Sequence, residues 1–175
     1  TRQLSEEIHE NVVVSVLRNG ERCSIARASV SRSIVVNSGI LVRPDLYETA
    51  TGRVLLAFSD EDTLRGVIQG KGLPGDRWAG IETESQLRET LHKVREAGVA
   101  YETSEDEEVH ALAVPVFYPD GKIAAAIGSY VPTGRFTEKM KKRILGSVVA
   151  AAGRMSYSLA LLAGNQKRPE SPALV

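Results

Sequence analysis

Alternating and helically spaced apolar residues divide the first part of the chain into a helix and a hairpin. Thr1–Glu10 has apolar residues four positions apart, as on one face of a helix. The β-branched run Val12–Leu17 follows, and the pair Asn19-Gly20 joins it to a second apolar run at Cys23–Ala28. An Asn-Gly pair between two such runs is a strong signal for a β-hairpin.

The next part of the chain predicts one strand and two helices. Ile34–Val36 is a short β-branched run and is expected to be the third strand. Leu46–Phe58 has the composition of a short helix, and either Thr49 or Thr51 can cap its start. A second helix is expected directly afterwards, running to Ile68.

A glycine-rich stretch separates these helices from a third. Gly70–Gly80 is expected to be an exposed, mobile loop. Thr83 and Gln86 then form the capping box of a helix that ends at Gly98, because glycine readily adopts the left-handed conformation found after a helix. Val99–Thr103 is expected to be a strand.

The last part of the chain predicts a second hairpin and a long helix. The runs VHALAVPVF and KIAAAIGSY flank a Tyr-Pro-Asp-Gly turn at residues 118–121, and both runs are rich in alanine, glycine and serine. Thr137 is expected to cap a long helix, and residues 164–175 are expected to form a disordered tail. Strands at both ends with helices between them predict an α+β fold, with a mostly antiparallel sheet covered by helices.

Composition narrows the class of protein. The 175 residues suit one domain, and the 22 basic and 22 acidic residues give a net charge of zero, which argues against binding nucleic acid by this chain alone. The single cysteine, Cys23, excludes an internal disulfide and suits a reducing, cytoplasmic compartment. No apolar run approaches 18 residues in the printed sequence, so no membrane partner is expected.

Two features indicate where a ligand could bind. The start of the Leu46–Phe58 helix offers free N–H groups and a partial positive charge, which suit a carboxylate. The small side chains of the second hairpin leave space above one sheet face, which either a closely packed helix or a pocket would occupy. Nucleophile-elbow, phosphate-loop and His–carboxylate motifs are lacking from the sequence, so an enzyme is the less favoured class.

Four segments in this order resemble the effector-binding domain of IclR-type bacterial transcription regulators. They are LYETATGRVLLAF (46–58), LRETLHKVREAGVAYETSE (87–105), LAVPVFYPDGKIAAAI (112–127) and the helix after GRFTE (134–138). The resemblance implies a GAF-like curved sheet with helices on its faces, an effector pocket on one face, and binding without catalysis. It assigns residues 1–10 to the end of a linker helix and 11–163 to the effector-binding domain.

The same resemblance implies partners and a mode of action. A small organic acid would be the effector, with no cofactor and no metal ion. Homodimers or tetramers are expected, and DNA would be bound only through an N-terminal winged helix-turn-helix domain that this sequence does not contain. An oligomerisation module without a ligand remains the alternative, followed by an enzyme on a GAF-like fold.

Departures from the family pattern suggest which acid would bind. Ala111 and Gly128 replace the Cys and Ser that relatives often carry, and Tyr101 and Tyr130 add aromatic surface. We therefore expect an aromatic or longer-chain acid whose carboxylate meets the backbone near Ala50 and Thr51. The expected ligand-binding residues are Ile34, Val36, Ala50, Thr51, Tyr101, Ala111, Gly128, Ser129 and Tyr130.

Other conspicuous residues have simpler interpretations. Cys23 is expected to be a buried small apolar residue, and Ala111 rather than His110 is expected to face inward. The acidic stretch that includes Glu102 and Glu108 is expected to be a solvated turn. No histidines stand at metal-ligand spacing, so no metal site is predicted.

Overall fold

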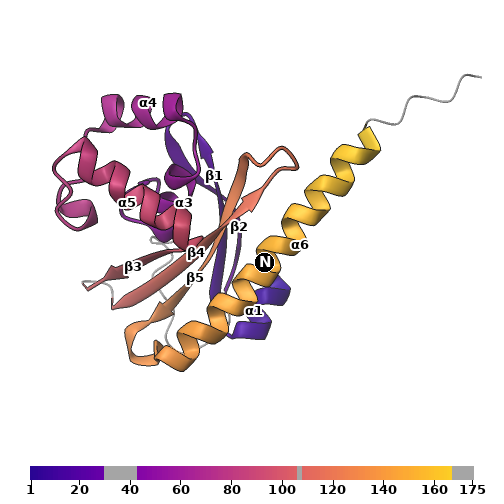
Figure 1. Cartoon of the computed structure of the whole chain (residues 1–175). Helices are drawn as coiled ribbons and strands as arrows, with labels where there is room; N and C mark the ends of the chain where they lie inside the picture. The colour runs from indigo at the N-terminus through magenta and orange to yellow at the C-terminus, as the bar shows by residue number, and fades with distance from the viewer. Residues whose placement is uncertain (30–42, 106–107, 167–175) are drawn as a thin grey trace, which may run out of the picture.

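The structure is a computed structural model of the chain, and it describes residues 1–29, 43–105 and 108–166. Its elements, in chain order, are α1 (Arg2–Ile8), β1 (Asn11–Arg18), β2 (Glu21–Ala28), α3 (Ala50–Ala57), α4 (Glu61–Lys71), η1 (Asp76–Trp78), α5 (Glu84–Ala97), β3 (Ala100–Ser104), β4 (Val109–Phe117), β5 (Ile123–Pro132), η2 (Thr133–Arg135) and α6 (Glu138–Gln166). The strands form one antiparallel sheet in the order β2-β1-β5-β4-β3, with helices on both faces (Figure 1). The predicted α+β class is confirmed.

Local signals placed most elements correctly. Asn19 and Gly20 both have positive φ, 51° and 74°, as the tight turn between β1 and β2 requires. Thr49 caps α3, because its side-chain oxygen accepts a hydrogen bond from the Gly52 N–H at 3.1 Å. The capping box at the start of α5 is present, and Gly98 ends that helix with φ 65°. The predicted strand Ile34–Val36 lies outside the described residues.

Two boundaries differ from the prediction. The glycine-rich stretch after α4 is not simply an exposed loop: it contains η1, whose Trp78 is buried, and a bridge between Gly75 and Ile81. A tryptophan buries enough apolar surface to anchor such a segment on the core. At the other end, α6 continues to Gln166, past the expected start of the tail at residue 164.

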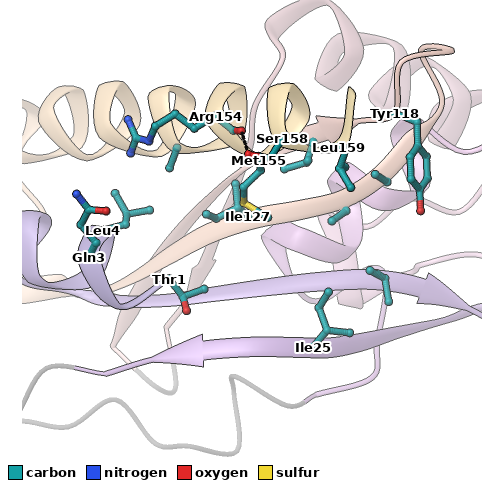
Figure 2. A pocket seen from close by; sticks show the side chains of 15 residues that line it. Thr1, Gln3, Leu4, Ile25, Tyr118, Ile127, Arg154, Met155, Ser158 and Leu159 are labelled. Atoms are coloured by element: carbon teal, nitrogen blue, oxygen red, sulfur yellow. Dashed lines mark hydrogen bonds between the residues drawn. The ribbon is translucent and has the colours of Figure 1, made fainter. Parts of the chain in front are cut away.

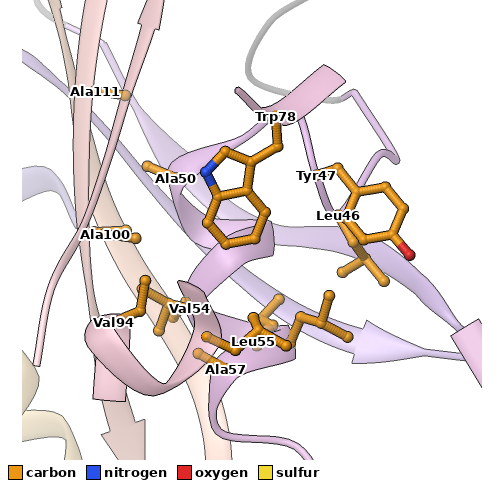
Figure 3. Close-up of a cluster of buried hydrophobic side chains, with 14 of the residues drawn as sticks. Leu46, Tyr47, Ala50, Val54, Leu55, Ala57, Trp78, Val94, Ala100 and Ala111 are labelled. Carbon is orange, nitrogen blue, oxygen red and sulfur yellow. The ribbon is translucent and has the colours of Figure 1, made fainter. Parts of the chain in front are cut away.

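The face of the sheet that carries α3, α4 and α5 holds one of two hydrophobic clusters (Figures 1 and 3). On the sheet side, this cluster consists largely of small residues, including Ala100, Ala111, Ala113 and Ala126. Because they present so little side chain, α3 packs close to β4 and β5. Of the two alternatives for the space above the hairpin, the closely packed helix is the one observed there.

The opposite face carries α1 and α6 and is packed with larger aliphatic side chains (Figure 1). Leu112, Val114 and Ile127 of the sheet meet Ile144 and Val148 of α6 in this second cluster. The segment 138–164 of this helix is long and apolar enough to cross a membrane by length and composition, since an 18-residue window in it has a mean hydropathy of 1.4, although its inner side packs on the sheet. The apolar composition of α6 is therefore explained only in part by the core of one chain.

Candidate functional site

A group of polar side chains, all buried except the half-buried Arg53, lies around the first turn of α3. We call it the Thr51 cluster, and it consists of Arg22, Thr51, Arg53, Glu102 and Tyr130. Its members come from β2, α3, β3 and β5, so only the folded chain brings them together. Polar groups are expensive to bury without partners, which makes such a cluster a candidate for function.

Arg22 is the basic centre of the cluster. It is only 2% exposed, and its Nε donates a hydrogen bond of 2.6 Å to the Thr51 hydroxyl oxygen. Its Nη1 donates to the backbone carbonyl of Arg43 at 2.5 Å. Burial lowers the pKa of Arg22 from its usual value. The neighbouring Cys23 is exposed, which corrects the prediction that it is buried: Arg22 takes the inward position of the strand instead.

The Tyr130 hydroxyl is an unsatisfied group in this cluster. The side chain is fully buried, and its hydroxyl lies beside Thr51 and Arg22 but makes no hydrogen bond of standard geometry within the described residues. Burial raises the pKa of Tyr130, and the charge of Arg22 acts in the opposite direction. The phenol is therefore a neutral donor at physiological pH, placed beside a cation.

Arg53 occupies the other side of the first turns of α3. Its Nε donates to the carbonyl of Tyr47 at 2.7 Å and its Nη1 to the carbonyl of Tyr101 at 2.6 Å, while its guanidinium lies 4.7 Å from the centre of the Trp78 ring. Burial lowers the pKa of Arg53 to about 10, and the carboxylate of Glu102 opposes this shift. Arg53 thus stays cationic at neutral pH.

Glu102 was expected in a solvated acidic turn, and the structure corrects this. It is buried in β3, directly opposite Ala111 of β4 in the strand register. The alternation of the strand turns Glu102 inward, whereas its neighbour Tyr101 is partly exposed. The carboxylate therefore belongs to the electrostatics of the Thr51 cluster.

This arrangement suits an anion. The first N–H groups of a helix have no partners within the helix, and the helix dipole adds partial positive charge there. Since the Thr51 oxygen accepts the bond from Arg22, its own O–H can still donate. Together with the Tyr130 hydroxyl, these groups are donors that a carboxylate could accept hydrogen bonds from.

The structure brings five of the predicted ligand-binding residues to one side of the sheet and separates two others. Ala50 and Thr51 begin α3, and this helix packs over the face that contains Ala111, Gly128 and Tyr130. Tyr101 and Ser129 pair with Leu112 and so point toward α6; consistent with this, the ammonium of Lys141 lies 4.5 Å from the centre of the Tyr101 ring. The remaining two, Ile34 and Val36, lie outside the described residues.

Gly128 has a different role from the one expected. A Cβ at this position would come within 2.7 Å of the Leu112 carbonyl oxygen and 3.1 Å of the Thr51 methyl carbon. The space that a side chain would have filled is taken by α3, so this glycine does not widen a cavity. It permits the close approach that brings Thr51 to the sheet.

An apolar cavity of about 480 Å³ lies on the opposite side, between α6, α1 and the sheet (Figure 2). Its walls include Leu4, Ile25, Met155 and Leu159, with Arg154 and Ser158 among the few polar side chains. The Ser158 hydroxyl already donates to the Arg154 carbonyl at 2.9 Å. The cavity lacks the buried cation and unsatisfied donor of the Thr51 cluster.

Metal binding has no support in the described part of the chain. Residues 1–29, 43–105 and 108–166 contain no group of three or more His, Cys, Asp or Glu side chains placed to hold an ion. His110 is turned away from the Thr51 cluster, as predicted: its ring stacks on Phe136, with 4.5 Å between ring centroids.

Sequence reasoning missed Arg22, Arg53 and Glu102 as members of the site. Alternate residues of a strand face opposite sides of the sheet. A charged residue that faces inward can therefore be recognised from the sequence only if it is known which residues of the strand face the core. In β2 the apolar residues Cys23 and Ile25 suggested that they face the core and that Arg22 faces outward, yet both are exposed. The Thr51 contact joins residues 29 positions apart, so no local pattern could have shown it.

Comparisons with known proteins agree with this fold. The sequence profile described as "Bacterial transcriptional regulator IclR C-terminal" matches residues 1–157. The chain belongs to the IclR family of bacterial transcriptional regulators and corresponds to its C-terminal, effector-binding domain. Its relatives are transcriptional regulators, not enzymes.

Two curated relatives illustrate the similarity. The chain is 30% identical to KdgR of Escherichia coli (strain K12) over 159 residues, which are 90% of this chain and 60% of the relative. It is 28% identical to the Pca regulon regulatory protein of Pseudomonas putida, covering 90% of this chain and 55% of that protein. The chain thus spans somewhat more than half the length of these regulators.

Solved structures show the same domain. The C-terminal domain of E. coli KdgR superposes with a TM-score of 0.73 at 26% identity, covering 90% of this chain and 92% of that one. A double mutant of the inducer-binding domain of PobR from Acinetobacter, in complex with 3-hydroxybenzoic acid, gives a TM-score of 0.74 at 25% identity, covering 89% and 92%. That neighbour binds a small aromatic acid.

Proposed function

We propose that this domain senses a small organic acid whose carboxylate binds at the Thr51 cluster. The observation that carries the proposal is the buried guanidinium of Arg22, bonded to Thr51 at the start of α3 beside the unsatisfied hydroxyl of Tyr130. Burying a hydroxyl without a hydrogen-bond partner costs stability, and a carboxylate that accepted a bond from Tyr130 beside the Arg22 guanidinium would recover that cost.

The acid that suits this site is aromatic or of longer chain. Ala111 and Ala50 give the surroundings of the cluster an apolar character, and Tyr130 adds an aromatic ring. The complex of the PobR domain with 3-hydroxybenzoic acid supports an aromatic acid as the first one to test. Since α3 fills the space at Gly128, the ring would not lie at Gly128.

The binding signal would leave the domain through α1. Tyr130 stands opposite Asn11, the first residue of β1, and the preceding Glu10 is fully buried. The Glu10 carboxylate accepts two hydrogen bonds from Arg135, at 3.0 Å and 2.7 Å, and Arg143 of α6 donates to the carbonyl of Ile8. A shift of β5 at Tyr130 would therefore reach the end of α1 through a charged junction.

The whole regulator would act on DNA in the bacterial cytoplasm through a further domain. Residues 1–10 would be the end of a linker helix, and a winged helix-turn-helix domain on its N-terminal side would bind DNA. Homodimers or tetramers would present two such domains to a DNA site. An effector changes DNA binding only if it binds two states of the domain with different affinity.

Ligand-dependent melting of the purified domain tests the acid site. We expect 3-hydroxybenzoate or benzoate to raise the Tm, with about 2.7 kcal/mol of added stability at a hundredfold excess over Kd, and pyruvate and glyoxylate to raise it less. Arg22→Met should abolish the shift, whereas Arg65→Met, at an exposed arginine of α4, should keep it. Thr51→Val serves as a second site variant if Arg22→Met melts too low to be measured.

Three results would contradict the proposal. A larger shift with pyruvate or glyoxylate than with every aromatic acid would refute the aromatic class. A Tm that no acid changes would favour the oligomerisation module. Conversion of the acid to a new product, seen by mass spectrometry of the incubated mixture, would favour an enzyme.

A further inference from the structure

Residues 72–81, between α4 and α5, form a short segment that we call the Trp78 strap. Its path depends on positive φ angles near both ends, 72° at Gly72 and 66° at Gly80, which glycine adopts without strain. The strap closes on itself, since the Gly75 N–H donates to the Ile81 carbonyl at 2.8 Å. Its two ends can therefore change conformation more easily than the helices on either side.

Two residues that precede α3 hold the strap in place. The Nη1 of Arg77 donates to the Asp45 carboxylate at 3.1 Å, and the Arg77 guanidinium lies 4.9 Å from the centre of the Tyr47 ring. The Tyr47 hydroxyl donates to the Gly72 carbonyl at 2.9 Å. These contacts involve no strand residue, so breaking them leaves the pairing of the sheet unchanged.

Trp78 is the part of the strap that reaches the Thr51 cluster. Its side chain is 7% exposed, and the guanidinium of Arg53, a member of that cluster, lies 4.7 Å from the centre of its ring. It belongs to the hydrophobic cluster on the α3 face with Ala50 and Ala111, and Figure 3 shows its ring near the start of α3, with the indole nitrogen on the side of Ala50. The ring thus lies between a cation and small apolar side chains.

The ring of an aromatic acid needs similar surroundings. A carboxylate beside Arg22 and Tyr130 would be buried, because these side chains are 2% and 0% exposed, so the ring attached to it must be buried as well. A flat ring is stabilised by apolar neighbours and by a guanidinium over its face. Both are present where the Trp78 indole lies.

We propose that Trp78 and the ring of the acid compete for one place, and that the acid binds by displacing the indole. This inference rests on the acid site proposed above and adds how a ring enters it. The strap swings about Gly72 and Gly80 and releases Trp78 to solvent, while the acid places its ring beside Arg53. The size of the indole then limits the ring system that the site accepts.

Displacement has a consequence for affinity that a simple contact does not have. Only the fraction of molecules with the strap open can bind, so the apparent Kd is the intrinsic Kd divided by that fraction. Removing the indole should therefore tighten binding. If Trp78 were instead a wall that touches the bound acid, removing it would weaken binding.

Isothermal titration calorimetry with 3-hydroxybenzoate measures the sign of this effect. Trp78→Ala should lower Kd about tenfold or more, because the place of the ring no longer has to be vacated. Leu64→Ala is the matched control: it truncates another buried side chain of the same hydrophobic cluster, in α4, and should leave Kd unchanged. An unchanged or higher Kd in Trp78→Ala would overturn the proposal.

Arg77→Met tests the movement of the strap. It removes the contacts to Asp45 and Tyr47 but keeps the indole, so it should also lower Kd, by a smaller factor than Trp78→Ala. Arg88→Met is its control, since Arg88 bonds to Glu61 and Glu84 outside the strap, and it should leave Kd unchanged. Equal Kd values for the two variants would show that binding does not require the strap to open.

Fluorescence tests displacement in the unmodified chain, whatever the stability of the variants. Trp78 is the single tryptophan of the sequence, so the emission reports its position. Benzoate should shift the emission to longer wavelength and increase quenching by acrylamide, because the ring moves into water. Acid binding that Arg22→Met abolishes, with an emission that benzoate leaves unchanged, would refute displacement and leave the acid site standing. If neither the wild type nor Trp78→Ala binds any acid, the proposed function fails, and displacement fails with it.

Discussion

The two faces of the sheet are made by the same strands, yet they differ in what they bury. Toward α3, the strands present alanine and glycine together with the charged and hydroxyl groups of the Thr51 cluster. Toward α6, they present Leu112, Val114 and Ile127. The small residues let a helix N-terminus and its polar neighbours come close to the sheet, whereas the large residues fill their own space.

This difference separates stability from recognition within one domain. A face of interlocking aliphatic side chains gains stability from burial and close packing. A face that buries a guanidinium and an unsatisfied phenol is less stable than an apolar face would be. A ligand bound there can accept the hydrogen bond that the phenol lacks. Substitutions on the two faces should therefore have different consequences.

The largest loss of stability is expected from Leu112→Ala on the α6 face. Leu112 is fully buried between the sheet and α6, and removing its side chain leaves a cavity that typically costs about 2–5 kcal/mol. Urea unfolding measures this loss. A change below about 1 kcal/mol would mean that the α6 face is not the tightly packed one, and the comparison of the two faces would fail.

A smaller loss is expected from Gly128→Ala on the α3 face. The new Cβ would collide with the Leu112 carbonyl and press on Thr51, and overpacking of this kind costs about 1–3 kcal/mol. Gly66→Ala is the control, since its Cβ meets open space in α4 and should stabilise by up to about 1 kcal/mol. If Gly128→Ala were as stable as the wild type, α3 would not be packed as closely as described.

The smallest effect on stability, and the sharpest on function, is expected from two neighbouring hydroxyls. Ser129 and Tyr130 are both fully buried without a hydrogen-bond partner among the described residues, but they point to opposite faces. Ser129→Ala and Tyr130→Phe should each change the free energy of unfolding by no more than about 1 kcal/mol. Acid-dependent melting should be weakened by Tyr130→Phe and unchanged by Ser129→Ala.

The opposite result would be equally informative. Loss of the melting shift in Ser129→Ala but not in Tyr130→Phe would move the ligand to the α6 face, where the apolar cavity lies. Equal effects of both variants would mean that the hydroxyls act through strand packing and not by contact with the acid.

Much of the fold could be predicted from the sequence because its signals are local. The Asn19-Gly20 turn, the capping box of α5 and the cap at Thr49 each depend on residues within four positions of one another, and each is present. The buried segment around Trp78 could not be predicted in the same way. Its glycines indicate a loop, and only the packing of Trp78 against the core orders it.

The candidate site could be predicted in part. The start of α3 and the face of Ala111 and Tyr130 followed from the sequence and from the family resemblance. The side chains that give the site its charge did not follow, because Arg22 lies in a strand whose apolar residues Cys23 and Ile25 are exposed. Tyr101 and Ser129 were grouped with Tyr130 although strand alternation turns them to the other face.

The sequence by itself determined the order of the helices and strands, their caps and turns, and the family, since all of these depend on neighbouring residues or on motif order. The tertiary structure decided which face each strand residue meets and which distant polar groups share a site. Successive side chains of a strand point to opposite faces of the sheet, and only the packing of helices on the sheet determines what each face meets. That packing placed Arg22 beside Thr51.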